Sequence, residues 1–360
     1  MSKNHIRKNL LIAALKNPAS MKNLSIAEWN ILLFDAHAAG LRGRLGEDIL
    51  ANGLWEEMPQ KVRQIFESSM VDAKAGQRKI MWELNRIRRA LYGFDGKIIL
   101  LKGAAYIALG LNVSRGRISA DIDILVAKNR LDQVEDLMLK AGWQHHVLNE
   151  YDQRYYRLWA HELPPLKHPD RQLEVDIHHN ILPQTSRLKP DIDLMIEDAV
   201  KIDKNIHCLS PQDMLLHSAV HLFHDGEIRG SIRNLLEQHD MIGEYAQEAC
   251  FWQTLLSRAK ALGLSRPLFY TLHYCMMFLE TEIPETVLRD MKKYAPNYLT
   301  GKMMDFMVSR ILLVPGAGQS TMLYYLSCKI LYMRSHWLKM PPVLLLRHLT
   351  TKFFRQFGKE

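Results

Sequence analysis

The stretch Ser119-Ala-Asp-Ile-Asp-Ile-Leu-Val126 places two aspartates in an alternating polar and apolar pattern. This alternation is typical of a β-strand, in which residues i and i+2 point to the same face. Asp121 and Asp123 are therefore expected to project together, with isoleucines on the opposite face. Leu173-Glu-Val-Asp-Ile-His178 shows the same pattern. If the second strand lies beside the first, Asp176 reaches the same place.

Three clustered carboxylates repel one another, and a divalent cation is the usual remedy. Carboxylates together with substrate phosphates hold Mg²⁺, and Mn²⁺ accepts the same oxygen ligands. Two such ions can activate an attacking oxygen and stabilise a leaving one in phosphoryl chemistry. A solvated strand face is the alternative, but aspartates are depleted in strands and the neighbouring apolar residues indicate a core strand. The sequence therefore predicts a Mg²⁺ or Mn²⁺ site.

The composition is that of a globular protein of two or three domains. The chain has 360 residues, of which 48% are hydrophobic and 24% are charged. Its four cysteines are widely scattered and form no CxxC pair, which excludes a thiolate zinc site or a disulfide framework. Free thiols are typical of a reducing compartment, so we expect a cytoplasmic protein.

Most of the net charge of +8 lies near the C-terminus. Residues 301–360 hold nine Lys and Arg against two acidic residues, and the first 300 residues are nearly neutral. This distribution argues against a nucleic-acid-binding surface over the whole protein. The basic residues alternate with apolar ones, as in Val343-Leu-Leu-Leu346 and Phe353-Phe354. We expect either an amphipathic surface for anionic lipid or a partner, or a helical lid packed on the core.

The sequence predicts neither a targeting segment nor a transmembrane segment. The apolar run Leu10–Leu15 is too short for a signal peptide. The longest apolar candidate for a span, Ile311–Cys328, is interrupted by Pro315–Ser320. These observations favour a cytoplasmic location, with peripheral membrane contact as an alternative.

Hydrophobic periodicity divides the chain into three parts and predicts an α+β fold. Residues 1–92 form an N-terminal helical segment, 93–207 a core with a small mixed β-sheet and flanking helices, and 208–360 a C-terminal helical domain with a basic tail. In the last part, Ser210-Pro-Gln-Asp213 has the order of a helix N-terminus. Strands are expected at 97–101, 118–126, 143–148 and 172–178.

Three segments occur in an order that resembles the polymerase-β-like nucleotidyltransferase superfamily. They are Leu101-Lys-Gly-Ala104, Arg117–Val126 and Glu174-Val-Asp-Ile-His178. More narrowly, the chain is similar, over roughly residues 80–240, to a bacterial family described as uncharacterised nucleotidyltransferases. The resemblance implies transfer of a nucleoside monophosphate from a nucleoside triphosphate to an acceptor hydroxyl, with release of pyrophosphate.

The resemblance also implies roles for individual residues. Asp121, Asp123 and Asp176 would bind the metal, and Asp176 would help to orient or deprotonate the acceptor. The phosphate-binding positions implied are Lys102, Gly103, Arg117 and Ser119. Supporting positions are Glu174, His178 and His221, and the family has an aspartate near Asp240.

Several alternatives stay open at this point. Ala104 follows Gly103 where the superfamily usually has serine, so a catalytically inactive nucleotide-binding or scaffold protein of the same fold is a rival interpretation. The acceptor is a small molecule, a protein side chain or an RNA end. His217, His221 and His224 share one helix face, where packed or hydrogen-bonded histidines are expected in preference to a zinc site.

Overall fold

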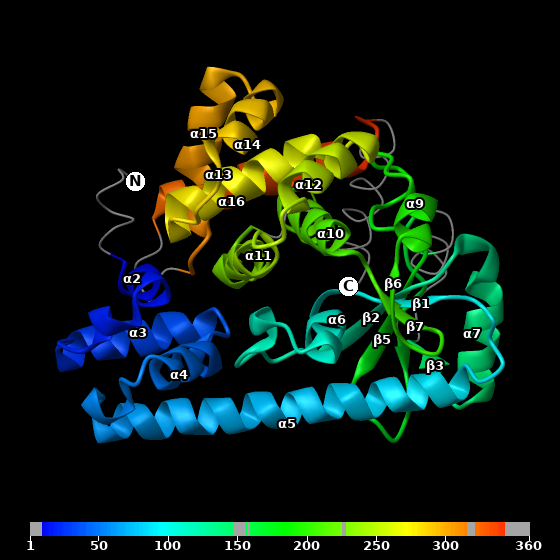
Figure 1. Ribbon diagram of the computed structural model, residues 1–360, viewed down its shortest axis with the longest axis horizontal. Coiled ribbons are helices and arrows are strands. Elements are labelled where there is room, and N and C mark those ends of the chain that lie inside the picture. The colour runs from blue at the N-terminus through cyan, green and yellow to red at the C-terminus, as the bar shows by residue number, and fades with distance from the viewer. Residues whose placement is uncertain (1–8, 147–155, 157–158, 225–227, 315–320, 343–360) are drawn as a thin grey trace, which may run out of the picture.

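The computed structural model describes residues 9–146, 156, 159–224, 228–314 and 321–342. In these ranges a seven-stranded mixed sheet is surrounded by helices from both ends of the chain (Figure 1). The predicted α+β fold is confirmed. The apolar segments at 343–346 and 353–354 lie outside the described residues.

The sheet has the strand order β3-β4-β5-β2-β1-β7-β6. The central strand β2 pairs parallel with β5 and antiparallel with β1, and β1 pairs parallel with β7. The strands are β1 (Ile98–Leu100), β2 (Asp121–Leu125), β3 (Gln144–His145), β4 (Leu166–Lys167), β5 (Glu174–His178), β6 (Val200–Asp203) and β7 (Ile206–Cys208).

The longest helix, α5 (Gln60–Ala90), runs along one side of the molecule from the N-terminal helices to the sheet (Figure 1). Its buried residues recur at helical spacing, as Phe66, Met70 and Ala73 do, so one stripe packs on the body and the rest faces solvent. The other helices at the N-terminal end are α2 (Leu10–Lys16), α3 (Ile26–Ala38) and α4 (Arg42–Ala51), and those of the core are α6 (Lys102–Leu109), α7 (Leu131–Lys140) and α9 (Ile192–Glu197).

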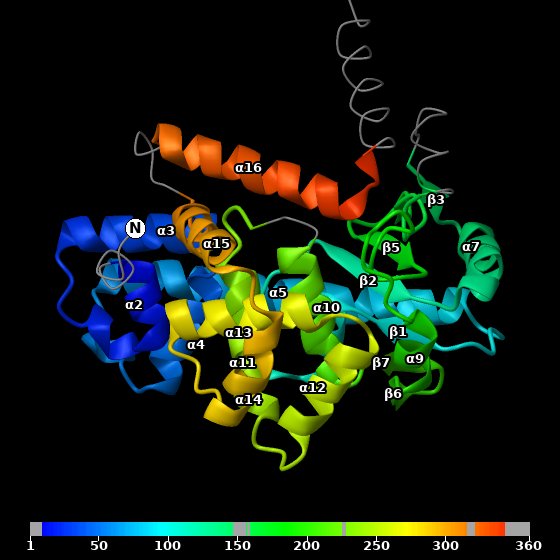
Figure 2. The same ribbon diagram turned by 90° about the horizontal axis from the view of Figure 1, so that it is seen from above.

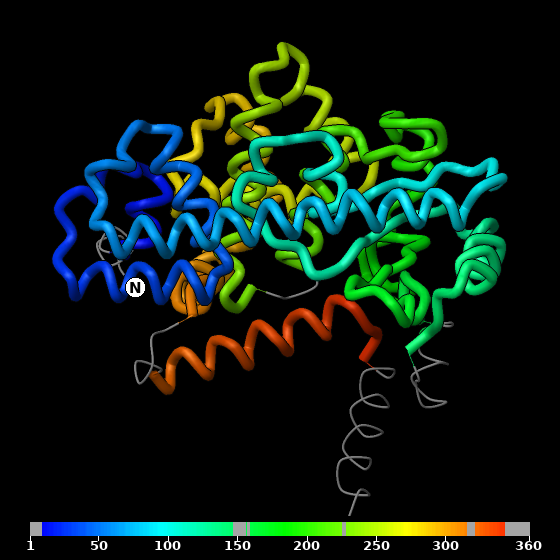
Figure 3. Tube along the Cα trace, turned by 90° about the horizontal axis from the view of Figure 1, so that it is seen from below, coloured from blue at the N-terminus to red at the C-terminus, as the bar shows by residue number. Residues whose placement is uncertain are grey.

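A second group of helices lies on the side of the molecule opposite α5 (Figure 1). They are α10 (Pro211–Phe223), α11 (Ile232–Tyr245), α12 (Phe251–Ala261), α13 (Ser265–Leu279), α14 (Glu285–Met291), α15 (Tyr298–Ile311) and α16 (Met322–Lys339). As predicted, Ser210 caps α10, its side chain accepting a hydrogen bond from the Asp213 amide, with proline in the first turn. Helix α16 lies on the outside of the molecule (Figures 2 and 3).

The strand expected at 118–126 is shorter than predicted, because β2 begins only at Asp121. Gly116, five residues before the start of β2, has φ +63° and packs directly on the backbone of Gly43 and Arg44 in α4. This contact draws the segment carrying Arg117 out of the sheet. The predicted strand at 143–148 is seen as β3, and residues 147–148 lie outside the described ranges.

The hairpin of β6 and β7 was not expected from the sequence. Its two short strands, the exposed β6 and the buried β7, flank the turn at Lys204, which has φ 39°. None of the helices in the described ranges has the length and apolar content needed to cross a membrane.

Candidate active site

The strand pairing brings the three aspartates to one part of the sheet. Strands β2 and β5 are parallel neighbours, in which Asp123 lies opposite Asp176 and Asp121 lies opposite Glu174. Because alternate residues of a strand share a face, all three aspartates project on the same side. The expected placement of Asp176 beside the first two carboxylates is confirmed.

Asp123 is the buried centre of this cluster, with 4% of its surface exposed. Its Oδ1 accepts a hydrogen bond from Lys102 Nζ at 2.8 Å and another from His178 Nε2 at 2.9 Å. Burial opposes ionisation, but Lys102 and His178 outweigh it and hold the pKa of Asp123 well below its ordinary value. Asp123 is therefore a permanent anion between two cationic side chains.

Lys102 has an unusual backbone conformation. It follows β1 by two residues, at the first position of α6, with φ 44°. This left-handed conformation is rare for a residue with a side chain and costs of order 1 kcal/mol. The conformation is compatible with an ammonium directed onto a carboxylate of the neighbouring strand.

Asp176 differs from Asp123 in having an oxygen that no donor satisfies. Its Oδ1 is buried and has no hydrogen-bond partner among the described residues. Burial, followed by the negative charges of Asp123 and Glu162, raises the pKa of Asp176 to about 7. Buried polar atoms without a partner are uncommon, and a catalytic role, a water molecule or a bound ion can account for one. This orphaned oxygen, together with the adjacent carboxylates, fits a divalent cation.

Two residues of the site, His161 and Glu162, were missed by the sequence analysis. Glu162 forms a single antiparallel bridge with His178. Its carboxylate lies 3.2 Å from His178 Nδ1, while Nε2 of the same ring contacts Asp123. Burial disfavours a charged imidazole, but Asp123 and Glu162 outweigh it and raise the pKa of His178. The result is a carboxylate–imidazolium–carboxylate chain that orients Asp123.

The donor atoms of His161, Glu162 and His178 lie within 4.8 Å of one another, close enough for one metal ion. In the structure, however, both nitrogens of His178 already contact carboxylates. No sequence signal pointed to this cluster, because the His161-Glu162 pair lies in a segment without a clear strand pattern.

Helix α10 covers the site with neutral histidines. Burial and then the Lys102 ammonium lower the pKa of both His217 and His221. His224, on the same helix, lies with Nε2 2.7 Å from the Ser186 hydroxyl oxygen. None of the three belongs to the His161 cluster, and packing with hydrogen bonding, as expected, accounts for them.

Gly103 lies beneath Arg117 and Ser119. The Arg117 guanidinium contacts the Ser119 hydroxyl, and a β-carbon on Gly103 would collide with both side chains. Arg117 Nε also donates to Glu237 Oε1 of α11 at 2.9 Å, and both partners are largely buried. Gly103 thus permits a buried ion pair that ties the segment before β2 to α11.

Two other residues singled out in the sequence take part in ion pairs. Glu174, the cross-strand neighbour of Asp121, lies 3.1 Å from His146 Nε2 and 3.6 Å from Lys167 Nζ. Asp240 accepts a hydrogen bond from Arg44 Nη2 at 2.9 Å, which links α11 to α4. The supporting role of Glu174 stays a prediction.

Replacing Gly103 by alanine is expected to lower the free energy of unfolding by about 2 kcal/mol, because the new methyl group displaces Arg117 from Glu237. Urea unfolding measures the change. Gly76→Ala is the control: nothing lies within 4 Å of its added methyl group, and Gly76 is inside α5. The control should gain about 0.5–1 kcal/mol from helix propensity. An equal urea midpoint for Gly103→Ala and the wild type would contradict the packing described.

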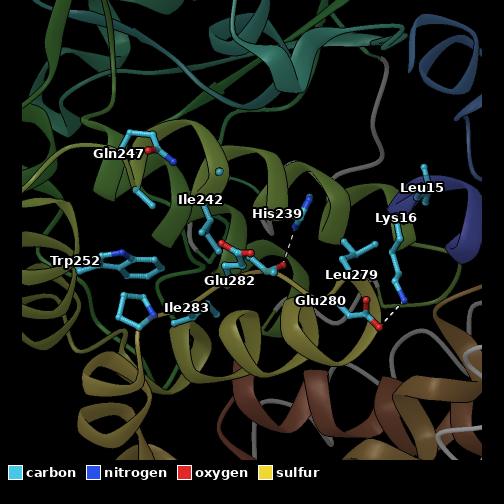
Figure 4. A pocket seen from close by; sticks show the side chains of 14 residues that line it. Leu15, Lys16, His239, Ile242, Gln247, Trp252, Leu279, Glu280, Glu282 and Ile283 are labelled. Carbon is cyan, nitrogen blue, oxygen red and sulfur yellow. Dashed lines mark hydrogen bonds and ion pairs between the residues drawn. The ribbon is translucent and has the colours of Figure 1, made fainter. Parts of the chain in front are cut away.

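A larger pocket of about 760 Å³ lies among the helices and shares no lining residue with the carboxylate cluster (Figure 4). Two pairs of its polar side chains contact each other. Lys16 pairs with Glu280 at 2.6 Å, and His239 lies 2.8 Å from the Thr281 hydroxyl. We therefore place the candidate chemistry at the aspartates and not in this pocket.

A family model described as "Uncharacterised nucleotidyltransferase" matches residues 25–280. The chain belongs to this nucleotidyltransferase family. The match contains every residue of the site described above and ends at the end of α13. No curated protein and no solved structure matches the nucleotidyltransferase chain.

Proposed function

We propose that the protein is a metal-dependent nucleotidyltransferase that moves a nucleoside monophosphate from a nucleoside triphosphate to an acceptor hydroxyl and releases pyrophosphate. The observation that carries this proposal is the carboxylate cluster, in which Asp176 has a buried oxygen without a donor. Membership of the nucleotidyltransferase family supports the reaction class.

Asp121, Asp123 and Asp176 would hold Mg²⁺ or Mn²⁺. Such an ion, when bound, neutralises phosphate charge and supports an attacking oxygen. Asp123 is suited to be a ligand because its low pKa keeps it anionic. Asp176, with a pKa of about 7, is suited to accept or share the proton of the acceptor hydroxyl.

The phosphate contacts are also a proposal. Lys102 is partly exposed, with 26% of its side chain accessible. Its ammonium can therefore leave Asp123 and bind a phosphate oxygen instead. Arg117 and Ser119 lie beside the start of α6, but Glu237 already neutralises Arg117. We therefore favour Lys102 for direct contact, with Arg117 and Ser119 fixing the segment above Gly103.

An inactive nucleotide-binding or scaffold protein is the second candidate. Its support is Ala104, which is buried and offers no hydroxyl to a phosphate. A protein of this kind would bind nucleotide without transferring it. The acceptor of the active alternative remains one of three classes: a small molecule, a protein side chain or an RNA end.

Incubation with α-³²P-labelled nucleoside triphosphates and a cell extract tests transfer. We expect label in a protein, RNA or small-molecule fraction with Mg²⁺ or Mn²⁺ and none with EDTA. Isothermal titration of each triphosphate with and without metal separates the two candidates. Metal-dependent binding with no transferred label would favour the inactive alternative, and equal binding without metal would overturn the proposed mechanism.

A further inference from the structure

Helix α16 exposes a large apolar stripe, which is unusual for a helix on the outside of a protein. Its outer stripe consists of Met322, Leu326, Lys329, Met333 and Trp337, spaced as one face of a helix. These apolar side chains are 86%, 48%, 60% and 48% exposed in chain order. The opposite face is buried and contains Tyr324, Ser327, Leu331 and Ser335.

The inward face of α16 is held by polar contacts. Arg229 Nε donates to the Tyr324 hydroxyl at 2.9 Å, and Arg334 Nη1 donates to the Phe223 carbonyl at 2.8 Å. At the C-terminal end, the Arg187 amide donates to the Leu338 carbonyl at 3.0 Å. The orientation of α16 is therefore fixed, and its apolar side is directed away from the body (Figures 2 and 3).

The exposed apolar surface continues onto α15. A groove of about 350 Å³ between the two helices is lined mainly by apolar side chains, among them Met303, Phe306 and Leu326. Met303 and Phe306 are themselves exposed. A continuous apolar surface of this kind on a soluble chain marks an interaction site.

The charges on this surface select the kind of partner. Helix α16 has Lys329 in its outer stripe and Lys339 in its last turn, while Arg334 is turned inward, and the helix carries no acidic residue. On α15, Lys302 borders the groove, and the only carboxylate, Asp305, pairs with His273 at 2.8 Å. A second copy of the chain, docked on the same face, would set lysines against lysines. An anionic surface is complementary.

We propose that the outer stripe of α16, with the groove beside it, binds the surface of a membrane that contains anionic phospholipid. Exposed Tyr325 and Tyr332 flank the stripe and Trp337 ends it, and such aromatic side chains are favoured at the membrane–water interface. Lys302 and Lys329 meet the phosphate headgroups.

Two features of the chain support a separate role for this surface. Helix α16 begins after the family match ends at residue 280, so it is an addition to the nucleotidyltransferase core. The sequence then continues with four more basic residues and two apolar clusters between 343 and 359. The proposal goes beyond the proposed enzymatic function and does not depend on it.

Sedimentation of the full-length protein with vesicles tests the proposal. Vesicles of phosphatidylcholine and phosphatidylglycerol in equal parts should carry the protein down, and pure phosphatidylcholine vesicles should carry at least about 10-fold less. High salt should weaken binding to the anionic vesicles. Failure to sediment with anionic vesicles, or equal sedimentation with both, overturns the proposal.

Met333→Glu places a carboxylate in the outer stripe and should lower the partition coefficient about 10-fold or more. Met81→Glu is the matched control, because Met81 is 47% exposed on α5 and should leave binding unchanged. Circular dichroism checks that both variants fold. Wild-type binding by Met333→Glu contradicts the assignment to α16. If light scattering shows that the wild type is a dimer and that Met333→Glu dissociates it, the face pairs two copies of the chain instead of binding a membrane.

Discussion

Replacing Asp121 by asparagine is expected to lower the rate of nucleotidyl transfer about 10³-fold without destabilising the fold. Asp121 is exposed at the start of β2, so the folded chain loses no buried contact when its charge is removed. What it loses is one of the three carboxylates proposed to hold the cation. Metal-dependent transfer of labelled nucleoside monophosphate measures the rate, and urea unfolding measures stability.

Asp123→Asn provides the comparison. It should abolish transfer to the same degree and, in addition, lower the free energy of unfolding by about 3–5 kcal/mol. The reason is that Lys102 and His178 both depend on the buried Asp123 carboxylate for neutralisation. Asp72→Asn, on the exposed surface of α5, is the control that should change neither quantity. Unchanged transfer in Asp121→Asn would remove that residue from the metal site.

The position of the aspartates could be predicted because it depends on strand periodicity. Alternation fixes which side chains share a face of a strand, and this rule placed Asp121 with Asp123 and aligned Asp176 with them. The register that sets Asp123 opposite Asp176 depends on which strands become neighbours. The order of the motifs along the chain indicated that these two strands are neighbours, whereas the residue pattern of each strand alone did not.

The partners of these aspartates could not be predicted, because they come from distant parts of the chain. His178 contacts Asp123, 55 residues earlier, and Arg117 contacts Glu237, 120 residues later. The first contact depends on the pairing of β5 with β2, and the second depends on the packing of α11 against the segment before β2. For the same reason the sequence did not show that Arg117 and Ser119 pack against Gly103, whose phosphate-binding role stays a prediction.

The exposed apolar stripe of α16 could be predicted only in part from the sequence. The mixture of basic and apolar residues predicted an amphipathic helix, with either membrane contact or a lid as its purpose. Which side faces the body is decided by polar contacts such as Arg229 with Tyr324, and these cannot be inferred from periodicity. A helix that buries serines and exposes methionines violates the usual pattern of a soluble surface.

Replacing Asp176 by asparagine is expected to stabilise the metal-free protein. The carboxylate of Asp176 is forced to ionise where burial and neighbouring negative charges raise its pKa to about 7 from an ordinary value of 3.8. A difference of about three pKa units corresponds to at most about 4 kcal/mol. The amide carries no charge, so the variant avoids this cost while keeping the same shape.

The gain in stability should depend on pH in a defined way. Since the folded-state pKa is above the unfolded-state value, the native protein binds the extra proton between about pH 4 and pH 7, and Asp176 lowers stability as the pH rises through this window. The variant and the wild type should therefore unfold alike near pH 4. Their difference should grow up to about pH 7 and stay constant above it. Thermal unfolding across this pH range measures the difference.

Divalent metal should reverse the order of stability of the wild type and the asparagine variant. A cation that binds the folded wild type at Asp176 stabilises it by mass action, and the asparagine variant loses a ligand and gains less. At pH 8 we expect the variant to be the more stable protein in EDTA and to lose that advantage in excess Mg²⁺ or Mn²⁺. An advantage independent of both pH and metal would mean that Asp176 is a packing residue and not a cation ligand. Loss of transfer without any gain in stability would mean that its buried oxygen is satisfied in solution. Only a carboxylate held in place for a cation should show the pH-dependent gain and the metal-dependent reversal together.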